Sequence, residues 1–169
     1  MLIAEWDHEE YLVKAVFVVS IATLLFGIAL FYVSNRKDDL NTTIIAAGNA
    51  RIQFEATSED LLLANDLHKY VGTVPLNSFM WMAYYGLSGI EPTSSLSPTN
   101  STTMADYLVQ VSNSINDYNN AITALDNESH WYGVAQDFLF WLESILQLIT
   151  VILASRLSVI SARRPARLG

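Results

Sequence analysis

The sequence predicts an all-α membrane protein in which an antiparallel helical hairpin outside the bilayer extends two transmembrane helices. Three observations indicate this class. Two long apolar blocks lie near the two ends of the chain, and the polar segment 35–137 between them has helical periodicity. That segment also divides into two arms of equal length, which favours a hairpin.

The first apolar block is the clearest element. No charged residue occurs from Ala15 to Val33, and ~20 apolar residues in a helix cross the ~30 Å hydrocarbon layer of a bilayer. We assign residues 15–34 to transmembrane helix 1 and residues 1–14 to a short cytoplasmic N-terminus. The block is too long for the apolar region of a secretory signal and has no basic segment before it, so we expect it to remain as an anchor.

Residues 138–160 form the second predicted span, which Glu143 interrupts near its outer end. A carboxylate at membrane depth is costly and needs a partner. One interpretation is a packing contact held by Tyr32, Ser34 or another chain, and the other is a proton or cation relay. Small and polar residues predicted to line the facing sides of the two spans are Ser20, Thr23, Gly27, Glu143, Gln147 and Thr150.

Basic residues set the expected orientation. The tail, residues 161–169, contains Arg163, Arg164 and Arg167, and such residues favour the cytoplasmic side. We therefore expect a multi-pass protein of the plasma membrane with both termini in the cytoplasm and residues 35–137 outside. The pair Arg36 and Lys37 is the contrary signal.

Two arms of 34 residues each make up most of the outer segment, Asp39–Gly72 and Met104–Asp137. The second arm has apolar residues at alternating spacings of four and three, which is typical of a coiled coil; they are Met104, Leu108, Val111, Ile115, Tyr118, Ile122 and Leu125. In the first arm a less regular apolar face is predicted from Ile45, Ile52, Ala56, Leu63, Leu67 and Tyr70.

Between the arms lies an uncharged tip, residues 72–90, rich in aromatic and methionine side chains. Such a cluster is typical of a contact surface for a partner protein. The predicted contact residues are Phe79, Met80, Trp81, Met82, Tyr84 and Tyr85. Two alternatives are that the tip forms its own small core between the arms or lies in the membrane interface. Residues 91–103 then predict an extended, mobile connector that ends in a helix cap at Thr102 or Thr103.

Composition excludes several function classes. The segment from Asp38 to Asp137 contains twelve acidic and two basic residues, so we expect no nucleic-acid partner. The chain has no cysteine and no nucleophile elbow, phosphate-binding loop or zinc-protease motif, so we expect no enzyme activity and no cofactor. The run Asp7–Glu10 surrounds a histidine with carboxylates and predicts at most weak metal binding, and His68 and His130 are isolated.

These features favour a non-catalytic accessory or scaffold subunit of a larger membrane complex, with other membrane subunits or a second copy as partners. The alternative is an extracytoplasmic sensor or ligand-binding module that dimerises as a four-helix bundle. The layout of span, helical outer segment and span resembles the input half of bacterial and archaeal chemoreceptors and sensor kinases. Those families continue past the second span into a signalling module, whereas this sequence stops soon after Ser161. The resemblance therefore implies a sensor that acts through a partner.

Overall fold

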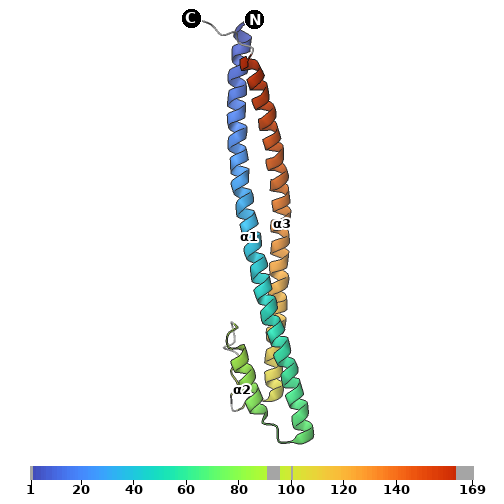
Figure 1. Ribbon diagram of the computed structural model, residues 1–169. Helices are drawn as coiled ribbons and strands as arrows, with labels where there is room; N and C mark the ends of the chain where they lie inside the picture. Colours follow the sequence, from blue (N-terminus) through green and yellow to red (C-terminus); the bar gives the residue numbers. More distant parts are fainter. Residues whose placement is uncertain (1, 91–95, 100, 163–169) are drawn as a thin grey trace. The chain divides into compact units, whose positions relative to one another are not determined.

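The computed structural model describes residues 2–90, 96–99 and 101–162, with side chains from residue 10 onward. The described part of the chain is helical and contains no strand, in agreement with the predicted all-α class (Figure 1). Helix α1 spans Leu2–Val71, α2 spans Leu76–Leu87 and α3 spans Met104–Ala162. α1 continues without a break through Asn35.

Two compact units divide the chain, and the two long helices contribute to both. The core unit comprises Asp39–Ser129, and the helix-pair unit comprises the residues before Asp39 and after Ser129. Every side chain that is buried in the described part of the chain belongs to the core unit.

In the core unit, α1, α2 and α3 bury one hydrophobic cluster together with a residue of the connector. Figure 1 shows α2 beside the two long helices in this unit. The buried members of the cluster are Phe54, Leu61, Met80, Leu87, Leu96, Met104, Tyr107 and Val111. Because neither long helix is apolar on all sides here, each depends on the other elements to cover its apolar stripe.

Polar and aromatic contacts fix how α1 and α3 pair within this unit. Ser129 Oγ donates to Asn41 Oδ1 at 2.9 Å, and Arg51 Nη1 donates to Asn119 Oδ1 at 3.2 Å. Next along α1, the Phe54 ring lies 5.5 Å from the Tyr118 ring. Within this unit α1 and α3 therefore run antiparallel to each other.

The prediction of which face of the first arm is buried was wrong. Those side chains are exposed, with Ile45 64%, Ile52 56% and Tyr70 89% accessible. A neighbouring stripe is buried instead, and it consists of Leu40, Phe54, Leu61 and Ala64. Leu40, Phe54 and Leu61 lie fourteen and seven residues apart on this stripe, and half-buried Ala47 lies midway between Leu40 and Phe54. Because the side chain of Ala47 is small, α3 can approach α1 closely there.

The second arm follows its predicted spacing more closely. All seven positions from Met104 to Leu125 are buried or half-buried, and Tyr107, which the spacing did not include, is fully buried. Thr103 caps the helix, since Asp106 N donates to Thr103 Oγ1 at 3.1 Å and Thr103 N donates to Asp106 Oδ2 at 3.4 Å. This reciprocal pair is a capping box.

The turn after α1 depends on one glycine. Gly72 has φ +71° and donates its N–H to the His68 carbonyl at 2.8 Å; this left-handed conformation suits glycine at a helix end. His68 Nδ1 donates to the Val74 carbonyl at 2.8 Å and holds the turn.

The connector differs from the predicted extended, mobile segment where it is described. Leu96 and Pro98 are both buried, and Leu96 belongs to the hydrophobic cluster. An apolar side chain at that position lowers the free energy of the folded state when the cluster covers it. Residues 91–95 and 100 of the same connector lie outside the described residues.

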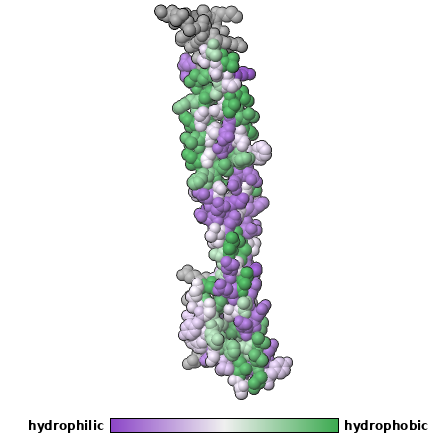
Figure 2. Space-filling model, in the orientation of Figure 1, coloured by the Kyte–Doolittle hydropathy of each residue, from purple (hydrophilic) through white to green (hydrophobic). Residues whose placement is uncertain are grey.

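The helix-pair unit has no buried side chain in residues 10–38 and 130–162. Hydrophobic side chains nevertheless cover much of its visible surface (Figure 2). α1 and α3 each contain a stretch that is long and apolar enough to cross a membrane, and no residue of either stretch is buried. This pattern differs from that of a core helix in a soluble protein, whose apolar face is covered by the rest of the protein.

Candidate partner-binding and intramembrane sites

The predicted tip folds as helix α2, which begins after Pro75. Met80 and Leu87 lie seven residues apart on one face of α2 and insert into the hydrophobic cluster. Ser88 closes the helix by donating from Oγ to the Tyr85 carbonyl at 2.8 Å. On this face of α2 the tip residues therefore form part of a core between the arms, which was one of the two alternatives to a partner contact surface.

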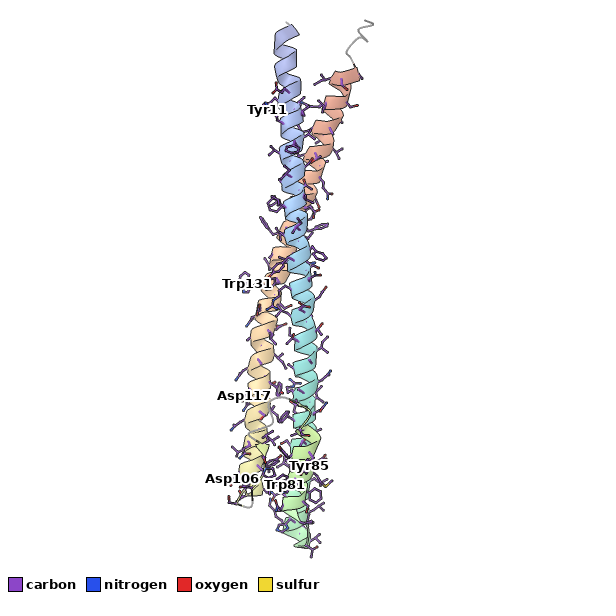
Figure 3. All side chains as sticks on the ribbon, turned by 90° about the vertical axis from the view of Figure 1, so that its left-hand side faces the viewer. Tyr11, Trp81, Tyr85, Asp106, Asp117 and Trp131 are labelled. Carbon is purple, nitrogen blue, oxygen red and sulfur yellow. The ribbon has the colours of Figure 1, made fainter. Side chains whose placement is uncertain are left out.

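The other face of α2 is open. Met82 is 68% accessible and Tyr85 is 67% accessible, whereas Phe79, Trp81 and Tyr84 are half-buried. The rings of Trp81, Tyr84 and Tyr85 contact one another, with centroids 5.7 Å apart for Trp81 and Tyr84, 5.8 Å for Trp81 and Tyr85, and 5.5 Å for the two tyrosines. Figure 3 shows Trp81 and Tyr85 near one another on α2. The contacting rings restrain one another, so this surface is rigid and costs little conformational entropy when a partner binds.

A groove of about 460 Å³ runs between α1 and α2 in the core unit. Side chains from α2 and from the exposed stripe of α1 form its walls, and a carboxylate and a hydroxyl add polar groups. The lining residues are Thr57, Asp60, Leu61, Leu63, Ala64, Leu67, Phe79, Met82, Ala83 and Gly86. Six lining residues were not predicted from the sequence, because only the contact of α2 with α1 brings them together; they are Thr57, Asp60, Leu61, Ala64, Ala83 and Gly86.

Glu143 on α3 faces Gly27 on α1 within the helix-pair unit. A Cβ atom at position 27 would lie 3.4 Å from Glu143 Oε1, so the glycine leaves room for the carboxylate. Gln147 Nε2 donates to the same oxygen at 3.1 Å. The structure thus brings together three of the six predicted polar residues.

The other three do not join this group. Thr23 and Thr150 donate to carbonyls one turn earlier in their own helices, both at 2.9 Å, and Ser20 is exposed. Such hydroxyl bonds satisfy the side chain without linking two helices. Ser34, considered as a partner of Glu143, accepts from Gln136 Nε2 at 3.5 Å instead.

Gln136 is a polar contact that the sequence did not single out. Its Oε1 accepts from Lys37 Nζ at 3.2 Å, so this residue joins Lys37 and Ser34 of α1 to α3. Only the pairing of the two helices reveals it.

No metal site is apparent where side chains are described, since no group of three or more His, Asp or Glu residues lies close enough to hold an ion. The side chains of Asp7, His8 and Glu9 lie outside that part. Glu10 accepts from Lys14 Nζ at 2.6 Å, and this hydrogen bond and the charge of Lys14 lower the pKa of Glu10. The ring centroids of His130 and Trp131 lie 5.9 Å apart.

No protein-family model matches this sequence, and no curated protein or solved structure is significantly similar to it. Its function must therefore be argued from the residues themselves.

Proposed function

We propose that this chain is a non-catalytic accessory or scaffold subunit of a larger membrane complex. In this proposal residues 15–34 and 138–160 span the plasma membrane, both termini are cytoplasmic, and the core unit forms an acidic hairpin outside. The spans pack against helices of other subunits, and the core unit binds a partner through the open face of α2. The open groove beside α2 is the observation that carries the proposal.

Membrane insertion is supported by the surface of the helix-pair unit. Large apolar side chains such as Phe17, Leu24 and Leu148 are 61–66% accessible in this unit, and in water such a surface would associate. Tyr11 and Trp131, 72% and 69% accessible, flank the two apolar stretches (Figure 3). Aromatic residues at these places suit the headgroup layers of a bilayer.

The groove supports a protein partner for the core unit. Leu63 and Met82 on its walls are 61% and 68% accessible, although the core unit faces water in this proposal. Covering such side chains contributes ~25 cal/mol per Å² of apolar surface. A partner helix with an apolar stripe would fit between α1 and α2, and a basic residue beside that stripe would face Asp60.

The test is mild-detergent purification of the tagged chain from its native membrane, with wild type compared with Met82→Asp. We expect wild type to bring down other membrane subunits in fixed stoichiometry, and we expect Met82→Asp to lose them because an aspartate would be desolvated in the groove. Val109→Asp is the matched control, since Val109 is 60% accessible on α3 and does not line the groove. A wild-type chain that purifies alone, or full assembly of Met82→Asp, contradicts the proposal.

The second candidate is a sensor or ligand-binding module, and the same groove favours it. Its volume falls within the ~300–1,000 Å³ of small-molecule sites, and a second copy of the chain would cover the exposed stripe of α1 in a four-helix bundle. A lone dimer in the purification, together with a higher melting temperature in the presence of an apolar amine, would favour this function over the accessory role.

A further inference from the structure

The helix-pair unit contains a cavity of about 620 Å³ on one side of α1 and α3. Its wall combines three apolar side chains with four polar ones, two of which are carboxylates. Its lining residues are Gly27, Leu30, Phe31, Ser34, Gln136, Asp137, Phe140 and Glu143. Gly27 lies beside Glu143 in this wall, where a Cβ atom would be in van der Waals contact with Glu143 Oε1.

We propose that this cavity receives a basic side chain, arginine or lysine, from a transmembrane helix of a partner subunit, and that this side chain pairs with Glu143. The inference rests on the proposed function, because it needs a partner subunit and a membrane. It adds the chemistry of that partner and the place where it binds.

The Glu143 carboxylate has no cation among its described contacts. Its described contacts are the amide of Gln147 and the backbone of Gly27. The described ion pairs Lys14–Glu10, Arg51–Glu55 and Lys69–Asp66 do not include it. An ionised carboxylate among apolar side chains in lipid is strongly unfavourable unless a cation neutralises it. One amide hydrogen bond does not supply that charge.

The basic residues nearest to Glu143 in this chain lie at other depths along the two helices. Lys37 Nζ is bound to Gln136, which lies seven residues or ~10 Å along α3 from Glu143. Arg156, the nearest basic residue on the other side of Glu143 along α3, is thirteen residues or ~20 Å away. A second copy inserted in the same direction would carry its basic residues at these same depths. Arg36 is nine residues or ~14 Å along α1 from Gly27. We therefore assign the cation at the depth of Glu143 to a different subunit.

The shape of the cavity favours a long side chain over a metal ion. A bare metal ion needs several oxygen ligands arranged closely around it, whereas this cavity is broad, and Leu30, Phe31 and Phe140 line it alongside the polar residues. An arginine or lysine side chain has an apolar stem that suits these walls and a charged end that suits Glu143. Arginine would also bind the carboxylate with two parallel hydrogen bonds.

The first test compares Glu143→Gln with wild type in the co-purification described above. Loss of the charge should lower partner recovery at least about tenfold, because it leaves the partner's cation unpaired in lipid. Glu143→Asp should retain partial recovery, since the charge remains. Asp117→Asn is the control, because it makes the same carboxylate-to-amide change at an exposed position of the core unit.

The second test identifies the basic residue directly. The chain has no cysteine, so Phe140→Cys carries a single thiol that a thiol-reactive photo-crosslinker can modify in the cavity wall. We expect the crosslinked partner peptide to be an apolar segment with an arginine or lysine within one helical turn of the linked residue. A crosslinked segment without a basic residue would overturn the inference.

The outcomes separate the two proposals. If wild type binds partners and Met82→Asp loses them while Glu143→Gln assembles fully, Glu143 is a neutral packing contact and only this inference fails. If wild type purifies without partners, the accessory function itself fails.

Discussion

At the residue scale, Tyr107 combines full burial with an unsatisfied hydroxyl. The side chain is 0% accessible in the hydrophobic cluster, and its Oη has no hydrogen-bond partner among the described residues. Burial, and to a smaller extent the nearby Tyr84, raises the pKa of Tyr107 to about 12. The ring therefore contributes apolar packing, while the hydroxyl reduces the stability of the core unit.

This environment predicts how Tyr107→Phe behaves. Removing a buried, unpaired hydroxyl should raise the free energy of unfolding by about 1 kcal/mol. In wild type, the unfolded chain loses the Tyr107 proton near pH 10 and the folded chain near pH 12, so the stability that this raised pKa contributes is complete below pH 10 and is lost as the pH rises to 12. Tyr107→Phe should lack this part of the decline.

Thermal unfolding followed by circular dichroism from pH 8 to 12 on the detergent-solubilised chains checks both points. The other tyrosines and the lysines titrate in both proteins, so the difference between the two curves isolates Tyr107. A lower melting temperature for Tyr107→Phe at pH 8 would show that the hydroxyl has a stabilising partner.

At the element scale, α1 carries two apolar stripes in the core unit, and only one of them packs on α3. The packed stripe contains Phe54 and Leu61, and the open stripe contains Ile52 and Leu63. Both stripes have helical spacing in the sequence, and the open one was predicted to be the core. Arg51 in the packed region interrupts the apolar pattern, although its side chain bonds across to Asn119.

Two substitutions distinguish the stripes. Phe54→Ala should lower the free energy of unfolding by about 3 kcal/mol or more, because it leaves a cavity beside Tyr118. Ile52→Ala should change it by less than about 0.5 kcal/mol, since Ile52 is 56% accessible. Chemical denaturation of the purified chain measures both values. Equal losses would mean that the open stripe is also packed, for example against a second copy.

The sequence predicted the elements better than their contacts. Charge-free length and regular spacing predicted the helices, and the spacing of α3 also predicted which side faces the core, because one apolar stripe dominates there. The two stripes of α1 could not be ranked without α3. Glu143 and Gly27 were predicted to lie on the facing sides of the two spans, whereas the cavity beside them depends on Phe140 and Gln136, which only the packed helices bring to that place.

At the scale of the whole molecule, the two units differ in where their apolar side chains lie. The core unit buries a cluster as a water-soluble domain does, whereas the described side chains of the helix-pair unit include none that is buried. Lipid around the helix-pair unit and water around the core unit would satisfy both surfaces. The proposed membrane topology follows from this contrast and from the basic tail.

The most direct measurement is labelling of single-cysteine variants in native cells with a membrane-impermeant maleimide, since the chain has no thiol of its own. Tyr70→Cys, Ser20→Cys and Ser161→Cys report on the core unit, the first span and the C-terminal end, and all three positions are exposed in the structure. We predict that Tyr70→Cys reacts in intact cells and that Ser161→Cys reacts only after lysis. Ser20→Cys should react only after the membrane is dissolved, because lipid covers it. Rapid labelling of Ser20→Cys in lysed cells with intact membranes would contradict membrane insertion and the account built on it.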